Sequence, residues 1–480
     1  MLNFRQGALC GSLCLFGLGI GCARELPGQT PPNSAFYFPV GLASSGDFGD
    51  GAGEYIYVVN SNFDQRYKSG WLTVVDMNAL LAGIDAGETG DSLTAAIVDE
   101  LQVPSLGGQL SVAPQGDLGL LTGRGGQPMT VIEISGGIDL SCGDPASVAD
   151  LNTALARTDC DRAHLIDVTP NVVKGAFPGT PLDVKEAAVA DAFSAHFVNV
   201  PASDGVSEVL YAVVSYLSST LVSVWEVDRA GDSLLRADRT LLLTSSGSRG
   251  IGALAVHPNR SVAGTVFVAA ANRFQGNSTV YSMGLRRTLD GEQEIDASRV
   301  LSAHSIGSEV GGLDVLDFAF NPSGDRAYAL NRGPESVVIL DTSLESVQVR
   351  SGGVNFYEQR PMYRPIGALS LRGRPSALVY LPRTEGPDLL AVSSFADDAV
   401  FILSVQGETF QVEQRIDRVG LGPYDIIAVQ RAGRSFLLVS TFFDHGLAVI
   451  DVSSSAPENF RRIAHVQSAR TEEFVGRREP

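Results

Sequence analysis

The chain has little lysine and no long run of basic residues. Lysine occurs only at Lys68, Lys174 and Lys185 among 480 residues, and 35 basic residues face 54 acidic ones, which gives a formal net charge of −19. A protein that binds DNA or RNA needs a basic surface to neutralise phosphates. We therefore expect no nucleic-acid partner. The simplest role of the large negative net charge is to keep an exported protein soluble.

Signatures of common catalytic sites are missing as well. The sequence has no Gly-x-Ser-x-Gly elbow, no Gly-Lys pair of a phosphate-binding loop and no His-Glu-x-x-His helix. The six histidines are scattered, and no Cys-x-x-Cys pair accompanies the cysteines. We therefore assign no catalytic residue and no metal ligand, and we expect binding rather than catalysis.

The N-terminus has the features of an export signal. Arg5 precedes an apolar run over residues 7–21, which is shorter than the roughly 20 apolar residues that span a bilayer. The run ends in "LGIGC", which resembles the lipobox of bacterial lipoproteins and implies lipidation of Cys22. This resemblance places the protein in the bacterial cell envelope, anchored to a membrane on its periplasmic or outer-membrane side. The alternative is ordinary cleavage after residue 21, which leaves Cys22 as a free thiol. Residues 22–35 are polar and Pro-rich, as in a tether.

The remaining cysteines predict a disulfide. Removal of residues 1–21 takes away Cys10 and Cys14, so Cys142 and Cys160 are left as a pair in an oxidising compartment. The alternative is two buried free thiols. We expect a short helix between these cysteines and a second helix over residues 184–196, both within an insertion at about residues 140–195.

Most of the chain repeats one pattern of strand, turn, strand, loop and strand. The clearest copy is "VLDFAFNPSGDRAYALNRGPESVVILDTS", at residues 315–343, in which "NPSGD" has the Pro and Gly of a tight turn. Seven copies occur, at residues 38–77, 109–134, 196–228, 252–283, 315–343, 376–405 and 424–452. They predict an all-β chain with a single β-propeller of about seven four-stranded blades over residues 36–466, followed by a polar tail at residues 467–480. Residues 460–466 fit the fourth strand of the last blade, so that the ring closes without a strand shared between the termini.

Three strings carry a resemblance to a known family. "YVVN", "NPSGDRAYALN" and "VVILD" resemble the YVTN-repeat β-propellers of bacterial surface and periplasmic proteins. The whole chain is similar to a bacterial lipoprotein of this class. The resemblance covers residues 36–466 and implies a fold, but it implies no ligand.

The loops after the second strands of the blades are expected on one face of the propeller. Loops carry recognition in most folds, and Arg and aromatic residues anchor interfaces. This face gains the aromatic residues Phe63, Phe274, Phe395 and Phe443. Its polar candidates for binding a ligand or an envelope protein are Asn60, Asp64, Arg66, Arg124, Asn272, Arg273, Asn331, Arg332, Asp397, Asp398, Asp444 and His445. The alternative is that these are turn residues beside a core of aromatic side chains.

Two other functions stay open. Asn60, Asn272 and Asn331 each end a second strand, and they are candidates for a central Ca²⁺ site of a lactonase-like propeller hydrolase. The alternative for these residues is that Asn stabilises the turn through its side chain. The third possibility is a structural protein of the envelope.

Overall fold

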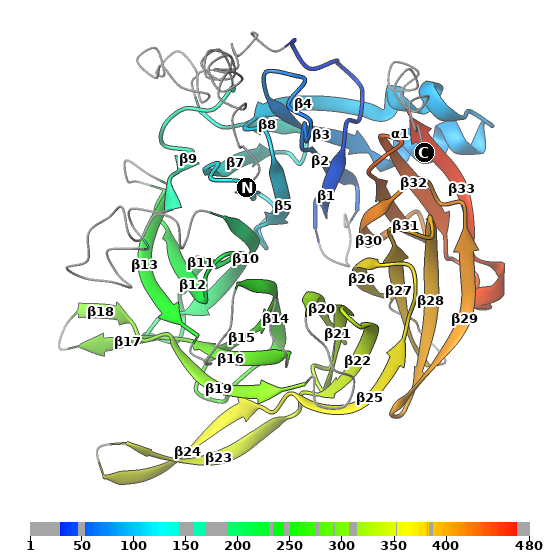
Figure 1. Ribbon diagram of the computed structural model, residues 1–480. Coiled ribbons are helices and arrows are strands. Elements are labelled where there is room, and N and C mark those ends of the chain that lie inside the picture. The colour runs from blue at the N-terminus through cyan, green and yellow to red at the C-terminus, as the bar shows by residue number, and fades with distance from the viewer. Residues whose placement is uncertain are drawn as a thin grey trace, which may run out of the picture.

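The computed structural model forms a ring of seven antiparallel sheets, the blades, around a central space (Figure 1). It describes residues 29–46, 53–143, 158–168, 172, 191–229, 234–243, 250–273, 278–290, 293–306, 314–351, 353–381, 383 and 387–467. Each blade has four strands in its main path, and the seven blades correspond one to one with the seven sequence repeats. The expected propeller is thereby confirmed.

The blades are numbered in chain order, and their strands run from the centre outward. Blade 1 contains β1 (Pro39–Ser44), β2 (Tyr55–Asn60), β3 (Gly70–Asp76) and β4 (Ile97–Val103). Blade 2 contains β5 (Gly107–Val112), β6 (Leu118–Gly123), β7 (Met129–Ser135) and β8 (Asp139–Ser141), with β9 (Leu165–Ile166) paired to β7. Blade 3 contains β10 (Ala192–Pro201), β11 (Glu208–Tyr216), β12 (Leu221–Val227) and β13 (Leu235–Leu242). Blades 4 and 5 contain β14 (Ile251–Arg260), β15 (Val266–Asn272), β16 (Thr279–Leu285) and β19 (Arg299–Ser305); and β20 (Val315–Phe320), β21 (Arg326–Arg332), β22 (Glu335–Asp341) and β25 (Arg364–Ser370). Blades 6 and 7 contain β26 (Pro375–Leu381), β27 (Asp388–Ser394), β28 (Ala399–Gln406) and β29 (Thr409–Asp417); and β30 (Pro423–Arg431), β31 (Arg434–Thr441), β32 (Gly446–Asp451) and β33 (Arg461–Gln467).

Within the described residues, four blades carry additional elements between their third and fourth strands. Blade 4 inserts the hairpin β17 (Arg287–Asp290) and β18 (Gln293–Asp296), and blade 5 inserts the hairpin β23 (Leu344–Ser351) and β24 (Val354–Pro361). Blade 1 inserts α1 (Met77–Asp85) and a 3-10 helix (Gly90–Ala96). The Asp76 carboxylate caps α1, because it accepts hydrogen bonds from the backbone N–H groups of Asn78 and Ala79. A second 3-10 helix (Pro457–Asn459) precedes β33.

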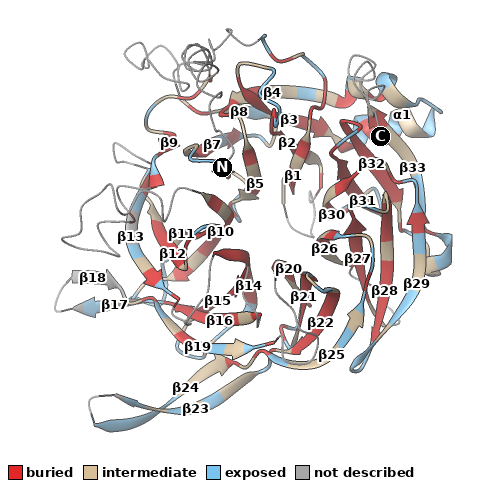
Figure 2. Ribbon diagram, in the orientation of Figure 1, coloured by how far each residue is buried: buried red, intermediate tan, exposed pale blue. Residues whose placement is uncertain are grey.

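The core lies between the blades rather than inside any one of them. Seven clusters of buried apolar side chains occur, one between each pair of neighbouring blades. Trp225 of β12, for example, packs with Leu120 of β6 between blades 2 and 3. The second and third strands of a blade are therefore buried on both faces, which explains their continuous apolar runs, whereas the outer strands are largely exposed (Figure 2).

The ring closes where blade 7 meets blade 1. Each of these blades is built from consecutive strands, so no strand is shared between the ends of the chain, as the sequence predicted. The closure depends on an apolar cluster that includes Ile56 of β2 and Phe436 of β31. Polar contacts cross it too, among them a 2.9 Å ion pair between Arg431 and Glu54.

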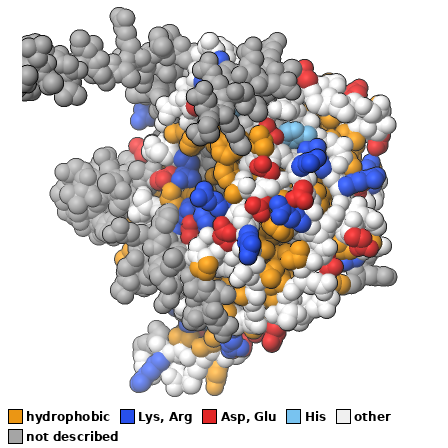
Figure 3. Space-filling view, turned by 45° about the vertical axis from the view of Figure 1, so that its right-hand side comes forward, with side chains coloured by type: hydrophobic (Ala, Val, Ile, Leu, Met, Phe, Trp, Pro, Cys, Tyr) orange, Lys and Arg blue, Asp and Glu red, His pale blue; other side chains and the backbone are white. Residues whose placement is uncertain are grey.

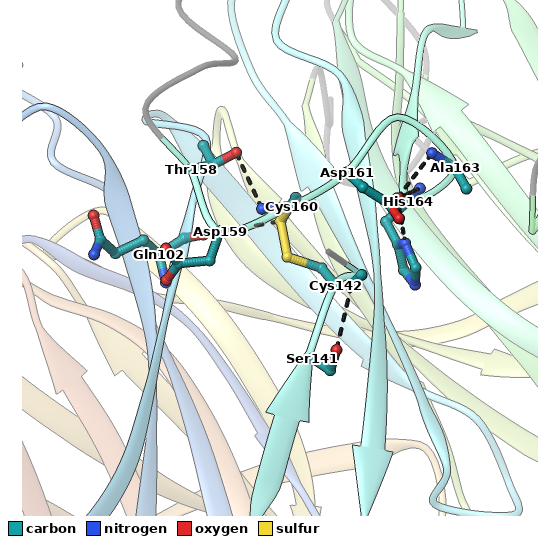
Figure 4. The surroundings of a disulfide bond; sticks show 10 residues. Gln102, Ser141, Cys142, Thr158, Asp159, Cys160, Asp161, Ala163 and His164 are labelled. Atoms are coloured by element: carbon teal, nitrogen blue, oxygen red, sulfur yellow. Dashed lines mark hydrogen bonds and ion pairs between the residues drawn. A yellow bond between two sulfur atoms is a disulfide. The ribbon is translucent and has the colours of Figure 1, made fainter. Parts of the chain in front are cut away.

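The predicted disulfide joins Cys142 and Cys160, and both cysteines are buried (Figure 4). The residue before Cys160 is held against β4 of blade 1. The Asp159 N–H donates to the Gln102 carbonyl (3.1 Å), and the Asp159 carboxylate accepts from the Gln102 N–H (3.0 Å). The disulfide thus lies at the boundary between blades 1 and 2.

The two helices expected in the insertion have different outcomes. The one predicted between the cysteines falls on residues 144–157, outside the described residues, and so does the first part of the one predicted at 184–196. The prediction is wrong for residues 192–196, which begin β10. Ala192, Ala195 and Phe197 are buried in the cluster between blades 2 and 3, so sheet pairing and packing outweigh the local helical pattern. No helix within the described ranges is both long and apolar enough to cross a bilayer.

Candidate binding face and central cavity

All seven inner strands begin on one face of the ring, which we call the entry face. The strand registers show this directly, because the first residue of each inner strand lies opposite the end of the second strand, as in the pairs Pro39 with Asn60 and Pro423 with Thr441. The loops that follow the second strands consequently lie on the entry face. The opposite face carries the turns between the first and second strands, including "NPSGD" at residues 321–325.

Each inner strand has an irregular register just inside the entry face. Such bulges redirect side chains and occur often beside functional sites. In four blades a hydroxyl group satisfies the N–H that the bulge releases; the Gln109 N–H donates to Thr122 Oγ1 (2.9 Å) and the Asp425 N–H donates to Ser440 Oγ (3.0 Å). The sequence signal that we missed is a Ser or Thr one place before the end of the second strand, at Thr122, Ser215, Ser393 and Ser440.

A cavity of about 300 Å³ opens at the hub of the entry face. Residues near the start of all seven inner strands line it, together with Arg332 at the end of β21 and three residues from the loops after second strands: Arg124, Leu217 and Arg273. Its volume lies at the lower end of the range found for small-molecule sites. Every blade contributes to this cavity, so its shape depends on closure of the whole ring.

Two of the lining arginines are held in fixed positions by carboxylates. Arg124 contacts Asp191 through Nε (2.7 Å) and Nη2 (3.4 Å), and Arg273 contacts Asp314 through Nε (2.5 Å) and Nη2 (3.0 Å). Each aspartate directly precedes the inner strand of the next blade, so both ion pairs also join neighbouring blades. Both guanidinium carbons lie 4.8 Å from the centre of the Phe193 ring, a cation–π distance.

Two aspartates of the cavity, Asp317 and Asp425, connect blades through the backbone. Asp317 accepts a 2.8 Å hydrogen bond from the Leu378 N–H of the next blade, and Asp425 accepts one of 2.8 Å from the Leu42 N–H across the ring closure. Burial raises the pKa of both carboxyl groups, that of Asp425 to about 7, and the nearby Asp317 adds to the rise at Asp425.

Six of the twelve polar residues predicted for this face are buried: Asn60, Asn272, Asn331, Arg273, Asp444 and His445. The three asparagines use their amides within the fold. Asn60 Oδ1 accepts from the Tyr37 N–H (2.8 Å), Asn272 Oδ1 accepts from the Thr279 N–H (2.5 Å), and Asn331 Nδ2 donates to Ser336 Oγ (3.4 Å). None of the three lines the central cavity, so these contacts agree with the structural alternative for asparagine at a strand end.

Asp444 and His445 also have structural contacts. Asp444 Oδ2 accepts from the Leu421 N–H (2.7 Å), and His445 Nδ1 accepts from the Phe38 N–H (3.0 Å). The His445 ring stacks on the Tyr37 ring at 4.6 Å. Burial lowers the pKa of His445 to about 4, so this imidazole is neutral at physiological pH.

The other six predicted residues reach the surface. Asp64, Arg66 and Arg332 are exposed, whereas Arg124, Asp397 and Asp398 are half-buried. Asp64 Oδ2 accepts from the Tyr37 hydroxyl (2.7 Å), and Asp398 Oδ1 accepts from the Gly422 N–H (2.8 Å). Figure 3 shows acidic and basic side chains next to one another, with hydrophobic side chains between them, on the face in view.

Aromatic side chains from blades 6, 7 and 1 form a cluster on the entry face, which we call the aromatic patch. Phe442 is central to it, with ring centres of Phe38 at 4.8 Å, Phe63 at 5.5 Å and Phe443 at 5.2 Å. The patch comprises Phe38, Phe63, Phe395, Tyr424, Phe442 and Phe443. Phe63, Phe395 and Phe443 were predicted for this face, Phe38, Tyr424 and Phe442 were not, and Phe274 falls outside the described residues.

Comparison with known proteins identifies the fold alone. No protein-family model and no curated protein sequence matches the chain. Among solved structures it is similar to hydrazine synthase of Kuenenia stuttgartiensis, at 13% identity and a TM-score of 0.50, over 91% of this chain and 100% of that one. It is also similar to Sqt1 of Chaetomium thermophilum, at 11% identity and a TM-score of 0.49, over 92% and 90% of the two chains. A β-propeller domain of Cps50 from Myceliophteria thermophila matches at 8% identity and a TM-score of 0.47, over 84% and 94%.

Proposed function

We propose that the protein is a lipid-anchored, extracytoplasmic β-propeller that docks a protein partner on the aromatic patch of its entry face. The "LGIGC" string and the apolar run before it support export and anchoring through Cys22. The similarity of its strand motifs to YVTN repeats supports a place at the bacterial surface or in the periplasm.

The exposed phenylalanines of the aromatic patch carry this proposal. Phe63 is 61% exposed and Phe443 is 42% exposed. Both rings contact the Phe442 ring, so the two exposed side chains belong to one cluster. Single exposed apolar residues are ordinary, but neighbouring aromatic ones on a loop-rich face are typical of interaction sites. Aromatic side chains of this kind dominate the binding energy of protein interfaces.

The charges around the aromatic patch indicate the chemistry of the partner. Asp64, Asp397, Asp398 and Asp417 lie around it together with Arg66, Arg374, Arg415 and Arg418, and Arg415 is paired with Asp417 at 2.7 Å. A partner with an apolar centre and a rim that carries charges of both signs therefore complements this surface.

Crosslinking in cells tests the docking site. A photo-crosslinking amino acid replaces Phe63, and in a matched variant it replaces Val262, which is 94% exposed in the turn between β14 and β15 on the opposite face. We expect a discrete crosslinked protein from position 63 and none from position 262, and loss of the crosslink when Phe443 is also changed to Ser. Crosslinks from position 262 alone, or from neither position, contradict the proposal.

A further inference from the structure

Among the described residues, one cation of the central cavity has no partner for its charge. Arg332 ends β21, lines the cavity and is exposed, and its guanidinium has no hydrogen bond or ion pair within the described part of the chain. Arg124 and Arg273, by contrast, are each neutralised by an aspartate. A guanidinium that lines a cavity without a carboxylate is a ready site for an anion, because it presents paired N–H donors in one plane.

The cavity wall next to Arg332, which blades 2 to 4 form, is partly cationic. The Phe193 ring lies against both Arg124 and Arg273, and each of these arginines is fixed by two contacts to its aspartate. Arg124 Nη1 makes no hydrogen bond to any described residue, so N–H donors remain on this side. Such fixed donors recognise a ligand with little loss of side-chain freedom.

The charge balance of the cavity limits the ligand to a small negative charge. Asp317 and Asp425 line it, and each of their carboxylates already accepts two backbone hydrogen bonds. A doubly charged anion would face these carboxyl groups with Arg332 as the one arginine of the described lining that has no carboxylate partner. A singly charged carboxylate pairs with Arg332 and adds the least negative charge beside Asp317 and Asp425.

Apolar side chains supply the remaining contacts. Leu254 and Leu316 line the cavity, and so does the Tyr424 ring, which belongs also to the aromatic patch. These groups favour an anion with a carbon chain or ring over an inorganic ion, since apolar surface gains free energy when it is buried.

We propose that the central cavity binds a small organic monocarboxylate, with its acid group at Arg332 and its carbon skeleton against Tyr424 and Leu316. The site shares Tyr424 with the aromatic patch, but binding of the acid needs no partner protein. It concerns binding only and involves no chemical step.

Ligand-observed NMR on the purified chain tests this proposal with benzoate and hexanoate as probes. Benzamide serves as the uncharged control and inorganic phosphate as the control for unspecific anion binding. The variants are Arg332→Gln and, as a matched control, Arg326→Gln, which changes an arginine at the other end of the same strand, on the opposite face. Both variants are first compared with the wild type by circular dichroism and thermal unfolding.

We expect at least one of the two acids to bind the wild type and the Arg326→Gln variant equally, and to bind Arg332→Gln about tenfold more weakly. Benzamide and phosphate are expected to bind at least tenfold more weakly than that acid. The proposal is overturned if neither acid binds at about 10 mM, if Arg332→Gln binds as the wild type does, or if phosphate competes equally. Because the assay contains only the purified chain, failure here leaves the crosslinking result at Phe63 untouched, and the reverse holds as well.

Discussion

The Asp425 carboxylate accepts a 2.8 Å hydrogen bond from the Leu42 N–H, although 383 residues separate the two along the chain. Its other oxygen accepts from the Ile426 N–H of its own strand, also at 2.8 Å. Asp317 repeats this arrangement between blades 5 and 6 with Leu378. The same carboxylate geometry thus joins blades both within the ring and across its closure.

The raised pKa of Asp425 makes a pH dependence of stability testable. A carboxyl group with a pKa near 7 in the folded protein and about 3.9 in the unfolded one binds its proton more tightly when folded, so its contribution to stability falls as the pH rises through this range. We expect the free energy of unfolding of the wild type, relative to Asp425→Asn, to fall by about 2 kcal/mol between about pH 5 and about pH 8. Chemical unfolding of both proteins across this range measures it.

The difference between the two proteins is the quantity to follow, because His445 contributes with the opposite sign. Its pKa is lowered to about 4, so it favours the folded state increasingly as the pH rises through the range between that value and 6.5. An Asp417→Asn variant, which changes an exposed carboxyl, should show no such difference from the wild type. A flat difference for Asp425→Asn as well would contradict the assigned burial of its charge.

The entry-face arginines should separate into two kinds by their effect on stability. Arg273→Ala leaves the Asp314 carboxylate, whose side chain is 13% exposed, without its partner, and we expect a loss of about 3 kcal/mol in the free energy of unfolding. Arg332→Ala should change it by less than about 0.5 kcal/mol, since this side chain is exposed. Urea unfolding of the two variants checks this, and equal losses would contradict the assignment.

The disulfide should stabilise the fold measurably. Replacing Cys142 and Cys160 together by Ser opens a loop with a sequence separation of 18, which corresponds to a loss of about 3 kcal/mol in the chain-entropy model. Urea unfolding measures this loss, and the double variant should have the same free energy of unfolding as the wild type that has been treated with a reductant. As an independent check, mass spectrometry of the unreduced, alkylated wild type should find no modification at either cysteine.

Cys22 should carry the membrane anchor. The change Cys22→Ala removes the only thiol available for lipidation at the "LGIGC" string, so we expect the protein to move from the membrane fraction to the soluble fraction of the cell envelope. Cell fractionation with immunodetection measures this, with Cys22→Ser as a second variant. A protein that stays firmly in the membrane fraction in both variants would show that the anchor lies elsewhere.

The sequence predicted the blades well because each one repeats a local signal. Strand β21, its "NPSGD" turn and β22 are all readable from residues close together in the chain. Helix α1 was missed even though its signals were local too: Asp76 is a typical N-cap and Leu80, Leu81 and Ile84 form an apolar face. Asp76 is also the last residue of β3, and the sequence pattern assigned it only to the end of that strand.

The site was predicted less completely, because its properties depend on contacts between blades. The sequence placed Arg124, Arg273 and Arg332 on one face of the propeller. Only the folded ring shows that they line its hub, and only the ring distinguishes the two paired arginines from the third. Asp317 and Asp425 were not selected, since each lies inside a strand and its partner N–H belongs to another blade.

The apolar cluster between blades 7 and 1 has a consequence for the order of events as the chain is synthesised. Blade 1 is made first, yet the side of Ile56 and Val58 that faces blade 7 stays uncovered until β31 and β32 have followed, late in the chain. The contacts that close the ring are therefore among those of greatest sequence separation, which form slowly. An incomplete chain of this kind exposes an apolar sheet face and is prone to associate with other chains. Folding of this protein in the cell should depend on factors that shield blade 1 until blade 7 is complete.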